Sequence, residues 1–230
     1  MSTTWKNDEE LFAMAKDKLF VALVGDTLDK MGYQHQFLSP QLKPIQSKMV
    51  IIGRAMPVLE ADFFADSAEG HAPVTGIPFG LMFRALDDLK KNEVYICSGS
   101  SHRYALWGGL MSTRAMQCGA AGAVVHGFHR DSSEIERLGF PVASIGSYAQ
   151  DQGVRGKVLD WRIPIEVDGV RVSNGDVIFG DRDGVLVIPA EIADEAFAGA
   201  FEKAKGENKV LKALKGGMST VDAFEKFGIM

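Results

Sequence analysis

The stretch GGLMSTRAMQCGAAGAVVHGFHRD, residues 108–131, carries the pattern that decides the fold of this chain. A helix is predicted to begin at the glycine pair that opens it, and Gly119 stands where a C-terminal cap is expected. The apolar run AGAVVHG then predicts a short buried strand. SSEIERL predicts a helix capped by Asp131 or Ser132, and FPVASIG predicts the next strand. Strand, helix and strand at this spacing indicate a parallel crossover unit.

Segments on both sides of this unit predict further strands. MVIIGRAMPV (49–58) and EVYICSG (93–99) are rich in residues that suit strands. Asp-Gly pairs at 168–169 and 183–184 each lie between two alternating apolar runs, which is typical of antiparallel hairpins. We therefore expect an α/β fold, with a parallel crossover core and added antiparallel hairpins.

Helical patterns are found near both ends of the chain. Apolar residues from Leu11 to Leu23 recur at helical spacing, and GDTLDKMG adds a second helix. A longer helix and then a shorter one are predicted in the last forty or so residues. We expect one domain over residues 1–230, with an N-terminal helical segment at about 7–32 and a C-terminal helical tail at about 190–230.

Composition and charge narrow the class of protein. The 230 residues are 46% hydrophobic and 24% charged, which is ordinary for a globular chain. A net charge of -5 argues against a nucleic-acid partner, because phosphate binding normally requires a basic surface. The polar N-terminus predicts no secretory signal, and no apolar run predicts a membrane span. Cys97 and Cys118 lack the CxxC spacing of thiolate zinc sites, so we expect a reduced protein in the cytoplasm.

The segment HGFHRD, residues 126–131, lies where a parallel strand is predicted to end. Such strand ends face the crevice in which α/β sheets bind ligands. Arg130 can hold a carboxylate through two hydrogen bonds, and Asp131 offers hard oxygen to Mg²⁺ or Mn²⁺. The alternative is structural: Asp131 caps the following helix, and Arg130 lies on the surface.

The histidines of this segment invite a zinc interpretation. Their spacing differs from the helical HExxH arrangement, and no cysteine or third histidine lies beside them. His126 is expected to be packed or hydrogen-bonded, and His129 to line a polar cleft. His102 is the other histidine near a predicted cleft segment, and it can equally be exposed.

The glycine pair at 108–109 precedes a helix, so backbone amides there are free to bind an anion. The segment lacks the lysine of a P-loop, which favours a carboxylate over a nucleotide. Close helix packing is an equally good explanation of the glycines alone. Together with Arg130 and Asp131, however, these backbone amides form a site suited to a 2-oxo acid. The same site suits the enolate that forms when a carbon–carbon bond beside the ketone breaks.

These motifs, with LGFPV and the later NGDVIFGDRDGVLVIP, resemble the family that joins the regulator of ribonuclease activity A to the class II 4-hydroxy-4-methyl-2-oxoglutarate aldolases. The resemblance covers nearly the whole chain. It implies a swivelling β/β/α layered sandwich and a homotrimer or homohexamer with sites between subunits. It also implies enzymes that cleave 4-hydroxy-2-oxo acids to pyruvate and often decarboxylate oxaloacetate.

The resemblance also implies roles for particular residues. Arg130 would bind the substrate and steady the enolate, and Asp131 would ligate Mg²⁺ or Mn²⁺ with waters in the other positions. A glutamate from the C-terminal helix of a neighbouring subunit would assist, and Glu207 is the candidate in this chain. The pyruvyl carboxylate would be seated by three backbone amides, those of Gly109, Leu110 and Met111.

Two positions depart from the family pattern. The aldolases carry an acidic residue where this chain has Gly109, and an aspartate where it has His126. Less negative charge around the metal should weaken Mg²⁺ binding or recruit His126 or His129 as a ligand. The substrate is therefore expected to differ from that of the named aldolases.

The preferred interpretation is a metal-dependent lyase acting on a small 2-oxo acid, with no organic cofactor. A water held by a carboxylate, by His129 or by the metal would serve as the base. The alternative is a non-catalytic regulator that binds a ribonuclease or another protein. A zinc hydrolase built on His126 and His129 is a third hypothesis. A methyltransferase finds no support, because no glycine-rich cofactor loop follows a strand.

Overall fold

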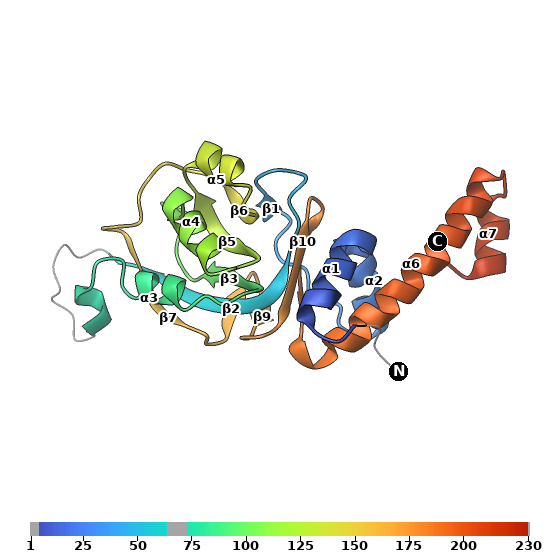
Figure 1. Cartoon of the computed structure of the whole chain (residues 1–230), viewed down its shortest axis with the longest axis horizontal. Helices are drawn as coiled ribbons and strands as arrows, with labels where there is room; N and C mark the ends of the chain where they lie inside the picture. Colours follow the sequence, from blue (N-terminus) through green and yellow to red (C-terminus); the bar gives the residue numbers. More distant parts are fainter. Residues whose placement is uncertain (1–4, 64–72, 230) are drawn as a thin grey trace.

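The computed structural model describes residues 5–63 and 73–229, and a mixed nine-stranded sheet forms the centre of this part of the chain. Its strand order is β1-β6-β5-β3-β2-β10-β11, with β4 beside β5 and β7 beside β2, and a separate ribbon pairs β8 with β9 (Figure 1). The strands are β1 Lys43–Pro44, β2 Ile51–Asp62, β3 Glu93–Ser98, β4 Ala105–Trp107, β5 Gly122–His129, β6 Val142–Ser147, β7 Gly156–Trp161, β8 Ile165–Val167, β9 Val170–Val172, β10 Val177–Asp181 and β11 Gly184–Ile188.

Helices cover the sheet from two sides. Figure 1 shows α3, α4 and α5 on one side, and α1, α2 and the start of α6 on the other, beyond β10. The helices are α1 Asp8–Lys18, α2 Val21–Lys30, α3 Met82–Asp87, α4 Gly109–Gln117, α5 Ser132–Leu138, α6 Ala193–Lys215 and α7 Thr220–Phe227, with short 3₁₀ turns η1 Pro73–Gly76 and η2 Ala190–Ile192.

The pairing directions confirm the predicted α/β fold. Strands β2, β3, β5 and β6 pair in parallel, as crossover connections through helices require. The ribbons β8–β9 and β10–β11 are antiparallel, and β10 adds to β2 in antiparallel register. The long strand β2 therefore joins the parallel half of the sheet to the antiparallel half.

Alternation of side chains along the strands divides the interior into layers. On β5, Ala123 and Val125 face the helices α3, α4 and α5, whereas Val124 faces a central core closed by the β8–β9 and β10–β11 ribbons. On β10, Val177 and Phe179 face a third cluster formed with α1, α2 and α6. These strands are covered on both faces, so the side chains on both faces are apolar. This explains their continuous apolar sequences.

The structure corrects three predicted boundaries. The first helix ends at Lys18, because Leu19 and Phe20 are extended and the amide of Val21 donates to the Asp181 carboxylate at 2.9 Å. The strand after residue 121 continues to His129, past an irregular register. The second hairpin turns at residues 182–183 and not at 183–184, since Asp181 pairs with Gly184.

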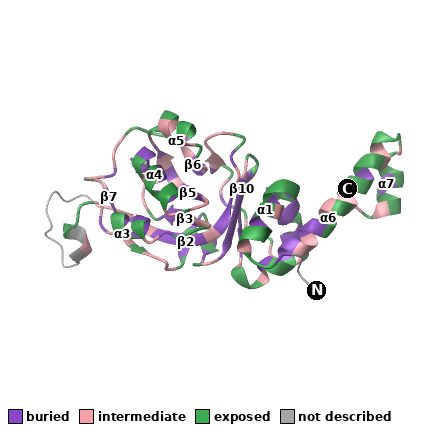
Figure 2. Ribbon diagram, in the orientation of Figure 1, coloured by how far each residue is buried: buried purple, intermediate pink, exposed green. Residues whose placement is uncertain are grey.

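The C-terminal helices form a projecting arm. Helix α6 packs against α1 and α2 at its start and then extends beyond the sheet, and α7 folds back along its far end (Figure 1). The reversal follows Gly217 in the left-handed region, and Ser219 caps α7 by accepting from the amide of Asp222. Exposed apolar side chains remain on α7, Val221 and Phe224 among them, and Figure 2 shows how little of the arm is buried. No helix in the ranges 5–63 and 73–229 combines the length and apolar character that crossing a bilayer requires.

Candidate active site

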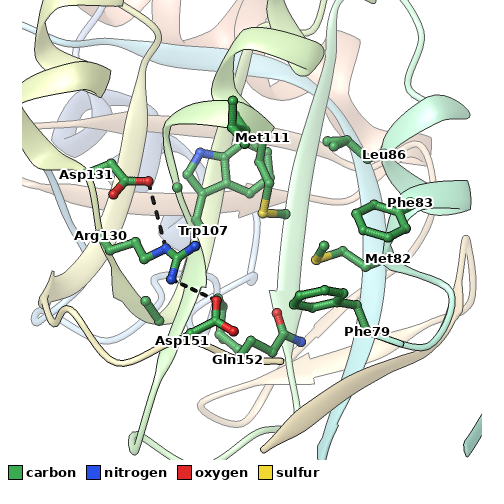
Figure 3. Close-up of a pocket in the computed structure, with 14 residues that line it drawn as sticks. Phe79, Met82, Phe83, Leu86, Trp107, Met111, Arg130, Asp131, Asp151 and Gln152 are labelled. Atoms are coloured by element: carbon green, nitrogen blue, oxygen red, sulfur yellow. Dashed lines mark ion pairs between the residues drawn. The ribbon is translucent and has the colours of Figure 1, made fainter. Parts of the chain in front are cut away.

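A cavity of about 340 Å³ lies between α3, the start of α4 and the end of β5 (Figure 3). Its size suits a small-molecule ligand. One wall carries Arg130, Asp131 and Asp151, which come from two separate segments of the chain. The residues that line it are Phe79, Met82, Phe83, Leu86, Ala105, Leu106, Trp107, Gly108, Leu110, Met111, Arg130, Asp131, Asp151 and Gln152.

The backbone after β5 places the Arg130-Asp131 pair at this cavity. The amide of Arg130 donates to the Trp107 carbonyl at 2.9 Å, which continues the pairing with β4 beyond the strand end. Asp131 then adopts a left-handed conformation with φ of 57°, which aspartate tolerates better than most residues. This reversal turns the Asp131 carboxylate away from its own helix and toward the start of α4.

Asp131 stands at the N-cap position of α5, as expected, but its side chain caps α4, which the local sequence did not predict. Its Oδ2 accepts from the amide of Gly109 at 3.0 Å, and its side chain makes no capping bond to α5. One of the three amides assigned to a substrate carboxylate is therefore already bonded to Asp131. Leu110 and Met111 also lie in the first turn of α4 and line the cavity, where helix geometry leaves amides without partners from the helix itself.

The glycine pair is held rigidly by the residues on either side of it. The Trp107 indole donates to Ser112 Oγ at 2.7 Å, and that hydroxyl donates to the Gly108 carbonyl at 3.1 Å. Trp107 is almost fully buried, so its ring forms a fixed part of the cavity wall.

Arg130 lies between two carboxylates. Its Nη1 is 2.7 Å from Asp151 Oδ1, and its Nε is 3.8 Å from Asp131 Oδ2 (Figure 3). All three side chains are 40 to 46% exposed, so these pairs add little to stability. Their effect is to orient the guanidinium and to leave part of its donor fork toward the cavity. Sequence reasoning missed Asp151, because nothing in SYAQDQG distinguishes it from a loop aspartate.

Space over Gly109 is taken by Glu134 from α5. A Cβ added at Gly109 would lie 2.7 Å from Glu134 Cγ, closer than such atoms approach. Glu134 also pairs with Arg137. The acidic side chain that the family resemblance predicts at position 109 is absent, and the aliphatic part of Glu134 lies over that position.

We predict that Gly109 and Glu134 are coupled in stability. Gly109→Ala should lower the free energy of unfolding by about 1 kcal/mol, because the new methyl group displaces Glu134. In a Glu134→Ala background the same change should cost clearly less, giving a coupling of about 0.5–1 kcal/mol in a double-mutant cycle measured by urea unfolding. Arg137→Ala is the control, since Arg137 pairs with Glu134 without touching Gly109. Additive effects of Gly109→Ala and Glu134→Ala would contradict the prediction.

His129 lies outside the cavity lining. It is 5% exposed, its Nδ1 is 2.7 Å from Ser144 Oγ, and its Nε2 is 2.9 Å from Ser132 Oγ. Burial lowers the pKa of His129, which favours the neutral ring. The ring ties together β5, β6 and the start of α5, and it reaches the Arg130-Asp131 region through the Ser132 hydroxyl.

His126 also lies outside the cavity lining. Its Nε2 is 3.0 Å from Asp168 Oδ1 in the β8–β9 turn, and its Nδ1 is 3.1 Å from Ser98 Oγ. Burial lowers the pKa of His126 more than Asp168 raises it, and the ring of His102 lies edge-on at 5.3 Å. Within the described ranges no three His, Cys, Asp or Glu side chains are grouped so as to hold a metal ion. The zinc hydrolase hypothesis gains no support from these histidines.

Glu207 lies on α6 and does not line the cavity of its own chain. Its carboxylate is 3.4 Å from Nζ of Lys203, one turn earlier on the helix. Its assignment to the site of a neighbouring subunit stays a prediction.

Gln152 connects the cavity to a buried acid. Its Nε2 donates to Glu60 Oε2 at 2.7 Å, and Glu60 is 1% exposed. Burial raises the pKa of Glu60 to about 8, and the hydrogen bond from Gln152 opposes this only in part. Glu60 is therefore mostly a neutral acid at pH 7, behind the cavity wall.

We predict that Glu60 makes stability fall with rising pH. The folded pKa of about 8 lies above the ordinary value of 4.5, so the folded state holds one proton more between these values. The free energy of unfolding should then decrease by on the order of 1 kcal/mol per pH unit in that window. Glu60→Gln keeps an acceptor for Gln152 without the charge, and it should be more stable than wild type at pH 8.5 and nearly equal at pH 4.5 by urea unfolding. The control is the exposed Glu166→Gln; an equal pH response of both variants would refute the prediction.

Comparison with known proteins places this chain in a family. The family model described as RraA-like, Aldolase/RraA, matches residues 21–187, which include the whole cavity lining. The chain belongs to the RraA-like family. The family assignment predicted from the motifs is therefore confirmed.

Named relatives of this RraA-like chain include an aldolase. The protein DlpA of Legionella pneumophila is 28% identical over 207 residues, which are 90% of this chain and 32% of that protein. The 4-hydroxy-4-methyl-2-oxoglutarate aldolase of Thermus thermophilus is 32% identical over 110 residues, 47% of this chain and 66% of the enzyme. The chain thus spans about a third of the Legionella protein and about two thirds of the Thermus enzyme.

Solved structures show the same RraA-like fold. A protein described among novel cellulases from gut-associated microbes has a TM-score of 0.79 and 26% identity, covering 91% of this chain and 90% of that one. The Streptomyces coelicolor protein RraAS2, described as an unusual member of the RNase ES inhibitor RraA family, has a TM-score of 0.74 and 21% identity. The matched region is 89% of this chain and 97% of the Streptomyces protein. At this identity the likeness concerns the fold alone.

Proposed function

We propose that the chain is a divalent-metal-dependent lyase that cleaves a carbon–carbon bond of a 2-oxo acid. The reaction is retro-aldol cleavage of a 4-hydroxy-2-oxo acid, decarboxylation of oxaloacetate, or both, through a pyruvate enolate. The observation that carries the proposal is the Arg130-Asp131 pair, set beside the N-terminus of α4 on the wall of a cavity. The aldolase name of the Thermus relative supports the same reaction class.

The donor atoms at this wall suit a hard cation. Asp131 uses Oδ2 for the Gly109 amide, and its other oxygen is available for Mg²⁺ or Mn²⁺. Mg²⁺ is commonly held by one or two carboxylates with waters in the remaining positions, so Asp131 would hold it, and Glu134 or Asp151 would contact its waters. When bound, the metal would polarise the 2-oxo carbonyl and stabilise developing negative charge. The expected recruitment of His126 or His129 as a ligand is not needed for this donor set.

The substrate would be bound by the polar wall. The amides of Leu110 and Met111, at the positive end of α4, would receive the carboxylate. Arg130 would donate to the 2-oxo oxygen, which becomes the enolate oxygen, and Asp151 would keep the guanidinium in place.

The proton transfers follow from the bond that breaks. In retro-aldol cleavage the C4 hydroxyl loses its proton, the C3–C4 electron pair becomes the enolate, and C3 then takes a proton to give pyruvate. We assign the base to a water held by Asp151, a carboxylate that lines the cavity and is not needed as the metal ligand. His129 is the second candidate, because it can act through the Ser132 hydroxyl.

We also propose that the chain forms a homotrimer or homohexamer, in which Glu207 reaches a neighbouring cavity. The projection of α6 beyond the sheet and the exposed apolar residues of α7 support this arrangement (Figure 2). Size-exclusion chromatography with light scattering tests it, and a monomer at micromolar concentration would contradict it.

A coupled assay tests the activity. Pyruvate release from oxaloacetate and from 4-hydroxy-2-oxo acids is followed with lactate dehydrogenase, first with Mg²⁺ or Mn²⁺ and then with excess chelator. We expect turnover that the chelator removes and added metal restores. The competing proposal is a non-catalytic regulator of a ribonuclease or other protein, favoured by the absence of an acidic residue at position 109. No chelator-sensitive turnover of any tested acid would support the regulator.

A further inference from the structure

The cavity has a polar wall and an apolar wall that face each other. Arg130, Asp131 and Asp151 lie on one side, and the side chains of α3 and the residues before it lie on the other (Figure 3). The apolar wall, as we use the term, consists of Phe79, Met82, Phe83 and Leu86. Phe79 and Phe83 form a tilted aromatic pair with ring centroids 5.5 Å apart.

The apolar wall offers no partner for a second carboxylate. Among the lining residues within 5–63 and 73–229, Arg130 is the single cationic one, and it already faces two aspartates. The three charges of the polar wall sum to about minus one. A divalent cation would bring the sum to about plus one, and the proposed Glu207 of a neighbouring subunit would return it to about zero. Each substrate carboxylate then adds one negative charge, so one carboxylate is accommodated more easily than two. A second one would be placed against Phe79, Phe83 and Leu86, where an unpaired charge is costly.

We propose that the natural substrate carries one carboxylate and an aromatic group, the aromatic group lying against the apolar wall. The substrate class is then a 4-hydroxy-2-oxo acid with an aryl group at C4, which retro-aldol cleavage divides into pyruvate and an aromatic aldehyde. The inference rests on the proposed lyase function and adds the identity of the distal group. Aromatic rings prefer tilted or offset contacts of the kind that Phe79 and Phe83 already make.

The cleavage needs no further reactant. The C4 hydroxyl loses its proton, the C3–C4 bond breaks, and the aldehyde carbonyl forms at C4. The electron pair left on C3 is held as the enolate until C3 is protonated. Nothing is oxidised or reduced overall.

Two measurements separate this inference from the function on which it rests. Exchange of the pyruvate methyl protons with D₂O, in the presence of Mn²⁺, reports enolate formation on the pyruvyl half alone. The ratio of kcat/KM for 4-hydroxy-2-oxo-4-phenylbutanoate to that for 4-hydroxy-4-methyl-2-oxoglutarate reports the distal group. We expect metal-dependent exchange and a ratio of about ten or more. Exchange with a ratio of one or less would overturn the aryl inference and keep the lyase. Absence of both exchange and cleavage would overturn both.

A charge placed on the apolar wall should reverse the preference. Phe83 is 54% exposed, so Phe83→Arg should fold, and it should lower the phenyl-to-dicarboxylate ratio about tenfold by providing a second cation. Phe20→Arg is the matched control, because Phe20 is 46% exposed and lies outside the cavity lining. The control should leave the ratio unchanged. If Phe83→Arg alters the oligomeric mass and leaves the ratio unchanged, the apolar wall is a contact between copies of the chain and the inference is wrong.

Discussion

Asp131→Asn is expected to abolish chelator-sensitive pyruvate release without disturbing the fold. Asparagine keeps a side-chain oxygen for the Gly109 amide, and it tolerates the left-handed conformation that position 131 requires. The negative charge is lost, and the second oxygen, the one assigned to the metal, becomes an NH₂ group, so a hard divalent cation loses its ligand. We expect kcat/KM to fall by about 1,000-fold or more, equivalent to about 4 kcal/mol of transition-state stabilisation.

Two further variants make this test specific. Asp131→Ala should lose the activity and also the cap of α4, which costs about 1 kcal/mol of stability. Asp168→Asn provides the control, because Asp168 is another left-handed aspartate and lies outside the cavity lining. Thermal unfolding, Mn²⁺ binding followed by paramagnetic resonance, and the coupled assay should be measured on each. Full activity of Asp131→Asn with unchanged Mn²⁺ affinity would exclude Asp131 as the metal ligand.

Arg130→Ala is expected to reduce kcat/KM by about 100- to 1,000-fold, the usual effect of removing a donor that stabilises developing negative charge. Because this interaction strengthens as the enolate forms, kcat and kcat/KM should fall together. Arg130→Lys keeps the charge but not the planar fork, so it cannot bond to Asp151 and to the substrate in the same way. An intermediate loss is expected for lysine.

Arg171→Ala is the control for the arginine series. Arg171 is exposed on β9 and lies outside the cavity lining. It should retain activity within about threefold, as surface changes away from a site usually do. Retention of similar activity by Arg130→Ala would mean that the substrate is held by other groups, and the proposed mechanism would have to be abandoned.

Local sequence pattern was sufficient to anticipate part of the cavity wall that forms the candidate site. The strand before Arg130, the helix after Asp131 and the glycine pair at residues 108–109 each follow from short-range rules, and the structure brings the Arg130-Asp131 pair and the glycine pair together. Parallel crossover connections place consecutive strand ends on the same edge, so adjacency in the fold could be anticipated there.

The contacts that complete the site could not be anticipated in this way. Asp151 pairs with Arg130 from a loop with no pattern of its own, and Glu134 fills the space over Gly109 from the next helix. His126 and His129 are close in sequence to the site but turn away from it, because alternation along β5 and a register irregularity direct their side chains to other partners. Each of these contacts depends on which face of a strand or helix packs against its neighbour. A shift of one residue along a strand turns a side chain to the opposite face.

By itself, the sequence determined the alternation of strands and helices, the antiparallel hairpins and the family. It also determined that the Arg130-Asp131 pair follows the end of a parallel strand. These features depend on periodicity and on neighbours within a few residues. Only the tertiary structure decided that the Asp131 side chain caps α4, that Asp151 holds Arg130, and that an apolar wall lies opposite them across the cavity. Those contacts join segments far apart in the chain, and the packing of the layers alone determines which distant side chains meet.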